Sequence, residues 1–186
     1  MEIKCVMSKA YRMLKFPTPT EDQKNPIQIL MIGHGTGIAP FVSMMQKIDN
    51  QKLHDAYAIT MVYGIRDTNE SFLYKETMMK FFDGKPQYKL ILAVSRGEVT
   101  LSELDQSVNP LPLYYKGRVQ QVLSENSQNM QQVLQDESSY IMICGNKLSM
   151  GKEVSQALVR IRGNDGQAWM EKAVGSGRLM MEVWGE

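Results

Sequence analysis

The sequence contains few cysteines and histidines, the residues that form disulfides and bind zinc. The 186 residues include two cysteines and two histidines, and no pair among them has the spacing of a metal site. The composition argues against a disulfide-stapled secreted domain and against a zinc domain, so we expect no metal. A reducing compartment, the cytoplasm, is the expected location.

Excess charge of one sign and long apolar runs are also missing. The formal net charge is +1, from 21 basic and 20 acidic residues, so we expect no nucleic-acid partner and only a local site for any anion. No apolar run has the length of a membrane span, and Glu2 and Lys4 interrupt the start of the chain, which is unlike a signal peptide. We expect no membrane contact from this chain, although a longer parent protein could be tethered through another segment.

The composition, with 43% hydrophobic residues, suits one globular domain. Apolar runs with strand character alternate with segments of helical spacing. Strands are predicted at 27–32, 56–63, 88–94, 140–144 and 179–183, and helices at 38–48, 72–82, 119–134 in two pieces, 147–161 and 167–174. Residues 98–115 are predicted to form an irregular excursion. The alternation predicts an α/β fold with a doubly wound, mainly parallel sheet.

The stretch 27–41, IQILMIGHGTGIAPF, is the central candidate site. A predicted strand runs into a glycine-rich turn and then into a predicted helix, an arrangement that directs backbone N–H groups at an anion. Gly35, Thr36 and Gly37 are the candidate diphosphate residues, because glycine allows close approach and threonine adds a hydroxyl. A purely structural turn is the open alternative, since the G-x-G-x-G spacing is not the dinucleotide fingerprint G-x-G-x-x-G.

Polar residues follow the other predicted strands at their carboxyl ends. Arg66 follows the second strand, Ser95 and Arg96 follow the third, and the stretch 144–146 follows the fourth. Ligands of parallel sheets bind beyond these ends, so the residues are predicted to share one rim that holds a polyphosphate. Taken singly, each arginine is equally well explained as a solvated surface residue, and the cysteine as a buried structural thiol.

Six motifs stand in the order found in a known family. They are IGHGTGIAPF, YGIRDTNESFLYKE, AVSRGE, KGRVQQVL, YIMICGNKLSMGKEV and MEVWGE, spread over residues 32–186. With these motifs the chain resembles the NADPH-binding domain of the diflavin reductases, which share a ferredoxin-NADP reductase-like module. The resemblance implies a Rossmann-like NADP-binding fold of that type and a role in an NADPH-dependent flavoprotein oxidoreductase.

The resemblance also implies a domain organisation. Residues 1–25 are similar to the terminal strand and linker that follow a FAD-binding domain, and residues 26–186 to the NADPH-binding domain. The flavin-binding motifs R-x-Y-[ST] and G-V-[CA]-[TS] of the family are absent. We therefore expect the C-terminal piece of a larger reductase. Its preceding FAD-binding and flavodoxin-like FMN domains would pass electrons to an acceptor protein, and the isolated chain would be inactive.

By position, the resemblance assigns the residues that bind the phosphates. The turn Gly35, Thr36 and Gly37 would hold the diphosphate and the nicotinamide ribose, and Arg66 would hold a phosphate or the adenine side. The 2′-phosphate that distinguishes NADPH from NADH is assigned to Ser95, Arg96 and Lys116, with Arg118 as an additional cation. Guanidinium, ammonium and hydroxyl donors all suit a dianion.

The same resemblance assigns the end of the site where hydride is transferred. Cys144 would lie beside the nicotinamide, with Gly145 and Asn146 lining the cofactor. Glu182 would be the assisting carboxylate, and Trp184 would stack on the flavin and be displaced when the nicotinamide enters. The hydride chemistry itself belongs to NADPH and FAD.

Five positions depart from the family pattern. His34 stands where the family has proline, Ile65 where it has cysteine, Asn146 where it has aspartate and Arg118 where it has tyrosine, while Glu182 replaces a common aspartate. Two alternatives therefore stay open. One is a fragment of a single-flavin ferredoxin-NADP reductase, and the other is a nucleotide-binding interaction module without catalysis.

The missing flavin motifs lead to a first prediction. The purified chain is expected to carry no stoichiometric FAD, because most of the flavin-binding residues of the family are absent from it. The visible absorbance of the purified protein, before and after incubation with FAD and gel filtration, measures this directly. Stoichiometric FAD that stays with the chain would contradict the expectation.

Overall fold

A computed structural model describes residues 15–20, 22–68, 71–96 and 108–184. The terminal strand that we expected within residues 1–14 lies outside these ranges. Most of the expected excursion, residues 97–107, lies outside them as well.

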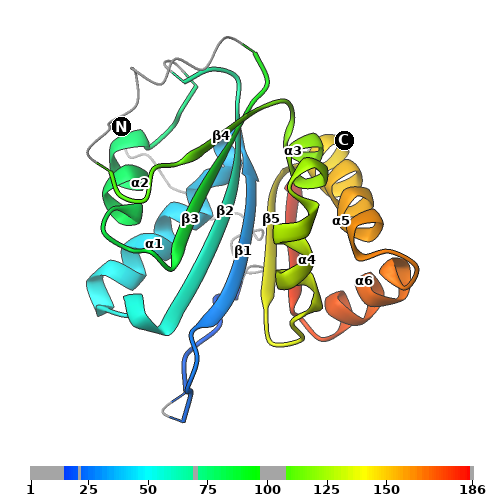
Figure 1. The fold of residues 1–186 in the computed structure, drawn as a ribbon, viewed down its shortest axis with the longest axis horizontal. Helices are drawn as coiled ribbons and strands as arrows, with labels where there is room; N and C mark the ends of the chain where they lie inside the picture. The colour runs from blue at the N-terminus through cyan, green and yellow to red at the C-terminus, as the bar shows by residue number, and fades with distance from the viewer. Residues whose placement is uncertain (1–14, 21, 69–70, 97–107, 185–186) are drawn as a thin grey trace, which may run out of the picture.

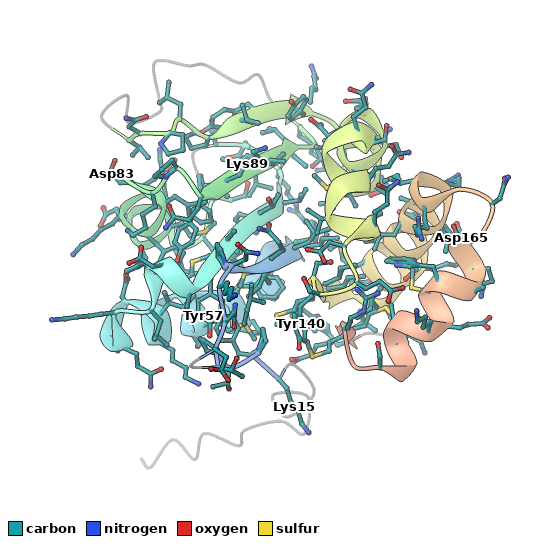
Figure 2. The ribbon with its side chains drawn as sticks, turned by 60° about the horizontal axis from the view of Figure 1, so that its bottom comes forward. Lys15, Tyr57, Asp83, Lys89, Tyr140 and Asp165 are labelled. Atoms are coloured by element: carbon teal, nitrogen blue, oxygen red, sulfur yellow. The ribbon has the colours of Figure 1, made fainter. Side chains whose placement is uncertain are left out.

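A six-stranded sheet in the order β4-β3-β2-β1-β5-β6 forms the middle layer, and every neighbouring pair is parallel (Figure 1). The strands are β1 Ile27–His34, β2 Tyr57–Ile65, β3 Tyr88–Val94, β4 Leu113–Lys116, β5 Tyr140–Asn146 and β6 Leu179–Trp184. The predicted doubly wound α/β class and the five predicted strands are confirmed. Figure 2 is turned toward the amino-terminal edge of the sheet, where Tyr57 and Tyr140 begin β2 and β5.

The strand β4 corrects the prediction that 98–115 is irregular throughout. Its four residues pair with Ile91–Val94 at the edge of the sheet. A four-residue run after Pro110 and Pro112 is too short to show a period of two, and partners in the sheet decide its conformation.

Helices cover both faces of the sheet. Helices α1 Ala39–Gln51 and α2 Lys75–Phe82 lie on one face, and α3 Val119–Glu125, α4 Ser127–Gln135, α5 Ser155–Arg162 and α6 Gly166–Gly175 lie on the other (Figure 1). Short 3-10 turns, η2 Gly35–Ile38 and η3 His54–Ala56, precede α1 and β2. Among these described helices, none has the length and apolar content needed to cross a bilayer.

One expected helix has a different start. Residues 147–161 were predicted as a single amphipathic helix, but the π-helical turn η5 Lys147–Val154 precedes α5. Gly151 lies in the middle of this wider turn, and glycine is a poor former of α-helix. The turn also brings Met150 over Gly145, because the position of a Cβ on Gly145 would be 2.6 Å from Met150 Cγ.

Side chains alternate between the two faces of each strand, so the sheet divides the hydrophobic core into two layers. Ile29 and Met31 face the layer of α1 and α2, whereas Leu30 and Ile32 face the layer of α3 to α6, and all four are buried. A strand buried on both faces reads as a continuous apolar run, which is why the middle strands were predictable.

The order of the strands reverses at β1. The chain leaves β1 toward β2, β3 and β4 on one side and returns to β5 and β6 on the other. Such a reversal opens a crevice at the carboxyl ends of the two central strands, where ligands of doubly wound sheets bind. The turn η2 lies at this position, between β1 and β5.

Glycine allows η2 to rest directly on β5. A Cβ on Gly37 would lie 2.4 Å from the carbonyl oxygen of Cys144 and 2.8 Å from its carbonyl carbon. Backbone atoms cannot move aside as the tip of a side chain can. The start of α1 is therefore held against the carboxyl end of β5 by a contact that only glycine permits.

This contact leads to a second prediction. Gly37→Ala is expected to lower the free energy of unfolding by about 1–3 kcal/mol, because the added methyl overpacks the joint. Gly175→Ala is the matched control, since no atom lies within 4 Å of its Cβ position at the end of α6, and alanine favours a helix by up to about 1 kcal/mol. Urea unfolding followed by circular dichroism measures both variants, and equal effects would contradict the account.

Candidate functional site

A pocket of about 330 Å³ opens at the carboxyl edge of the sheet. Its lining includes His34, Gly64, Arg66, Ser95, Arg96 and Arg118. Four of the predicted site residues, namely the three arginines and the serine, are thus brought together from the ends of β2 and β3 and from the start of α3. None of the described residues that line this pocket is acidic.

Backbone hydrogen bonds hold the loops after β2 and β3 side by side. The N–H and the Oγ of Ser95 donate to the carbonyl of Ile65 at 2.9 and 3.1 Å, and the N–H of Arg96 donates to the carbonyl of Arg66 at 2.7 Å. The two arginines therefore follow strands in register and emerge at the same edge. The hydroxyl of Ser95, which we predicted as a phosphate ligand, donates to a carbonyl in this structure.

Sequence reasoning missed Ser71 as the residue that shapes the Arg66 loop. Its Oγ accepts hydrogen bonds from the N–H groups of Arg66 and Asp67 at 2.9 and 2.8 Å, and it donates to the Asp67 carbonyl at 2.8 Å. The only signal in the sequence is a serine four residues after an aspartate, a spacing that many loops share.

Close packing at Gly64 brings Arg118 to the pocket. A Cβ on Gly64 would lie 2.5 Å from Val119 Cγ2, so glycine lets the start of α3 approach β2. The N–H of Arg118 donates to Oε1 of Gln121 at 2.7 Å, which caps the helix. Lys116 ends β4 opposite Val94 and is exposed, but it does not line the pocket.

The glycine turn directly follows His34, which lines the pocket, but Gly35, Thr36 and Gly37 are not part of its lining. Gly35 has a φ of +54°, a conformation that favours glycine, and its carbonyl accepts a hydrogen bond from the Tyr63 hydroxyl at 3.2 Å. Thr36 and His34 are exposed on the turn. The pKa of His34 lies below its ordinary value of 6.5, first because of partial burial and then because of the charges of Arg66 and Arg118. The positive charges of Arg66 and Arg118 thus disfavour protonation of the histidine that precedes the turn.

The opposite end of the rim holds two buried side chains, a thiol and a carboxyl. Cys144 and Glu182 are paired positions on β5 and β6, with exposures of 0% and 7%. Burial, followed by the Glu182 charge, raises the pKa of the Cys144 thiol to about 12, and burial raises the pKa of Glu182. Oε2 of Glu182 has no hydrogen-bond partner among the described residues. This end therefore holds a neutral thiol beside a carboxyl whose ionised form is disfavoured by burial.

The remaining predicted residues surround this end. Asn146 and Trp184 are paired positions on β5 and β6, and Trp184 is 42% exposed. Gly145 has a φ of +155°. Gly37 lies between the two ends, because it packs against the backbone of Cys144 while its turn follows His34, which lines the cationic pocket.

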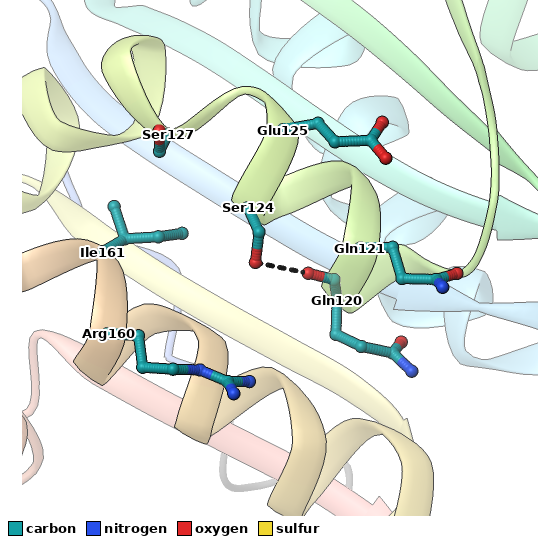
Figure 3. A pocket seen from close by; sticks show the side chains of 7 residues that line it. All are labelled: Gln120, Gln121, Ser124, Glu125, Ser127, Arg160 and Ile161. Carbon is teal, nitrogen blue, oxygen red and sulfur yellow. Dashed lines mark hydrogen bonds between the residues drawn. The ribbon is translucent and has the colours of Figure 1, made fainter.

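A second pocket, of about 580 Å³, lies on the outer side of the helices and not at the strand ends. Figure 3 shows it between α3 and α5, where the Ser124 hydroxyl donates to the Gln120 carbonyl at 3.0 Å. Glu125 and Arg160 give it charges of both signs, and it contains none of the predicted site residues. Within the described ranges, no cluster of three His, Cys, Asp or Glu side chains could hold a metal.

A parallel doubly wound sheet with a glycine turn at its reversal point, and a cationic pocket at the neighbouring strand ends, defines a nucleotide-binding α/β domain. The family of the oxidoreductase NAD-binding domain matches residues 31–156, and the chain belongs to this family.

Curated relatives agree with the resemblance stated from the motifs. The chain is 25% identical over 177 residues to an NADPH–cytochrome P450 reductase of Dictyostelium discoideum, a match that covers 91% of this chain and 24% of the relative. It is 30% identical to the sulfite reductase [NADPH] flavoprotein alpha-component of Vibrio vulnificus and to the methionine synthase reductase of Mus musculus. These matches cover 82% and 78% of this chain and 21% and 20% of the relatives.

These relatives are diflavin reductases, so the predicted kinship is confirmed, and the single-flavin alternative is not favoured. The chain spans a quarter or less of the length of each of these proteins.

The buried carboxyl group leads to a third prediction. Because the pKa of Glu182 is raised in the folded state, the contribution of Glu182 to stability is fully present below the ordinary value of 4.5 and is lost as the pH rises through the raised value. Glu182→Gln removes this loss, so its stability relative to the unchanged chain should be higher at about pH 8 than at about pH 4. Urea unfolding at both pH values measures the difference.

Glu137→Gln is the control, because its effect on the free energy of unfolding is expected to change with pH in the opposite direction. Hydrogen bonding and charge from Lys172 lower the pKa of the exposed Glu137, so its contribution is present at high pH and lost in acid. A Glu182→Gln variant that is relatively less stable at about pH 8 would contradict the assignment of an unpartnered buried carboxyl.

Proposed function

We propose that this chain holds NADPH across the carboxyl ends of its strands and presents the nicotinamide to FAD of a flavoprotein reductase. One observation carries the proposal: three arginines from separate loops share a pocket beside the glycine turn, in a chain that belongs to the oxidoreductase NAD-binding family. The position of the pocket at the carboxyl ends of β2 and β3, beside the reversal of strand order at β1, supports the same function.

The cationic pocket is proposed to select NADPH over NADH. Arg96, Arg118 and the Ser95 hydroxyl would hold the 2′-phosphate, since guanidinium groups form paired, charge-assisted hydrogen bonds with phosphate oxygens. NADH-specific Rossmann domains place an acidic residue on the ribose, and this lining has none. The exposed Lys116 at the end of β4 would add charge from outside the pocket.

The glycine turn is proposed to bind the diphosphate. The open space at the Cβ position of Gly35 leaves room for oxygens close to the backbone N–H groups, and the exposed Thr36 adds a hydroxyl donor. Arg66 would contribute charge from the neighbouring loop. The contact of Gly37 with β5 would then fix the distance between the phosphates and the nicotinamide end.

At that end, the side chains would position the nicotinamide ring. The neutral Cys144 thiol and the buried Glu182 carboxyl would present polar groups to the ring, while Gly145 and Asn146 would border it. When bound, NADPH supplies the hydride that FAD accepts. The exposed indole of Trp184 offers a flat surface for the flavin, from which the nicotinamide would displace it.

The rest of the reductase is proposed from the relatives. Their lengths leave room for FAD-binding and flavodoxin-like FMN domains, from which electrons would pass to an acceptor protein. The domain boundary near residue 26 and the cytoplasmic location remain part of this proposal. Turnover would need those domains, because this chain contributes the nicotinamide side of the reaction only.

Paired calorimetric titrations with NADP⁺ and NAD⁺ test the proposal. We expect tight binding of NADP⁺, much weaker binding of NAD⁺, and a loss of about 1.5–3 kcal/mol for NADP⁺ in Arg96→Ala, the value of a charged hydrogen bond. Lys47→Ala is the control, because this exposed lysine on α1 loses the same charge away from the pocket. Equal or absent binding of both nucleotides would favour a module that has lost the reductase site.

A further inference from the structure

His34 is a titratable side chain at the centre of the candidate phosphate site. It ends β1, directly before Gly35, and it lines the pocket that contains Arg66, Arg96 and Arg118. The Cδ2 atom of its ring lies 3.3 Å from the Cβ position of Gly64, so the ring leans across the end of β2. The imidazole is therefore placed between the glycine turn and the cationic loops.

Positive charge surrounds this imidazole from several elements. Arg66 acts on it from the loop after β2 and Arg118 from the start of α3, and Arg96 lines the same pocket from the loop after β3. On the η2 side, the Tyr63 hydroxyl donates to Gly35 and stays uncharged, because burial raises its pKa to about 12.

The carboxylates near the pocket face other partners. Asp67 accepts hydrogen bonds from the N–H and the Oγ of Ser71. On the η5 side, Glu153 accepts a hydrogen bond from Gln120 Nε2 at 2.7 Å, so Gln120 stands between this carboxylate and the pocket.

A ligand-free pocket thus favours the neutral imidazole. The lowered pKa of His34 leaves the ring mostly uncharged near neutral pH, and a neutral imidazole has one donor nitrogen and one acceptor nitrogen. The acceptor lone pair would repel a phosphate oxygen. A protonated ring has two donors and a charge, both of which a phosphate favours.

We propose that His34 takes up a proton from solvent when a dinucleotide binds and then serves as a direct donor to the diphosphate. This inference rests on the proposed function, since it concerns the same pocket. The diphosphate is chosen because His34 adjoins the Gly35 turn, whereas Arg96 and Arg118 are available to the 2′-phosphate. A bound diphosphate offsets the guanidinium charges that disfavour the imidazolium.

The sign of the pH dependence follows from linkage. Binding raises the pKa of His34, so affinity rises as the pH falls through the bound-state value and levels off below the free-state value. A rise of one unit gives an affinity about tenfold higher on the acid side than on the alkaline side. The histidine would thus make retention of the cofactor sensitive to pH in a range where arginines do not titrate.

The test is calorimetry of NADP⁺ binding to the full chain at about pH 7, in buffers of different ionisation enthalpy, which counts the protons taken up. His34→Gln keeps hydrogen-bonding capacity without titration. His54→Gln is the matched control, because the other histidine lies before β2, at the opposite edge of the sheet, where it pairs with Asp49. A second ligand, adenosine 2′-monophosphate, has the 2′-phosphate but no diphosphate.

We expect the unchanged chain and His54→Gln to take up the same fraction of a proton, and His34→Gln to take up less. Between about pH 8 and pH 6, NADP⁺ affinity should rise more in the unchanged chain than in His34→Gln, by up to about tenfold for a one-unit rise in pKa. Adenosine 2′-monophosphate should show no such difference. Thermal melting of each variant verifies that it is folded.

Each other outcome overturns a defined part of the account. Proton uptake that His34→Gln leaves unchanged, with Arg96-dependent NADP⁺ binding intact, overturns the inference alone. An equal effect of His34→Gln on adenosine 2′-monophosphate overturns the diphosphate assignment. Absence of NADP⁺ binding at every pH overturns the proposed function and this inference together.

Discussion

The backbone contact between Gly37 and Cys144 is the constraint on which the rest of the site depends. It places the glycine turn after β1 against the carboxyl end of β5, with 2.4 Å between a notional Cβ and the Cys144 carbonyl oxygen. The two strands are neighbours at the point where strand order reverses. The contact therefore fixes how far the phosphate end of the rim lies from the end that holds Cys144 and Glu182, a spacing that an extended dinucleotide would need.

The two ends of the rim have opposite electrostatic character. Arg66, Arg96 and Arg118 gather without any acidic neighbour in the lining, so that end favours anions. Cys144 and Glu182 are buried side by side, and burial raises the pKa of both, so that end disfavours additional negative charge. A cofactor with phosphates at one end and a ring that exchanges hydride at the other matches this division.

Much of this arrangement was predictable from the sequence, and the exceptions have physical reasons. The four strands β1, β2, β3 and β5 are apolar runs closed by glycine or serine, and the parallel-sheet rule places Arg66 and Arg96 at one edge. The strand β4 was missed because four residues carry no periodicity. The π-helical start before α5 places Met150 over Gly145, and the roles of Ser71 and Gly64 depend on distances between loops. Tertiary contacts of this kind have no signature in local sequence.

Nuclear magnetic resonance of the isotopically labelled chain, titrated with NADP⁺, tests the central claim most directly, because it reports on every backbone amide. The account predicts that the largest shifts fall on the turn after β1, the loops holding Arg66, Ser95 and Arg96, the start of α3, and the ends of β5 and β6. Shifts that cluster instead on the groove between α3 and α5 in Figure 3 would contradict it, as would the absence of any shift.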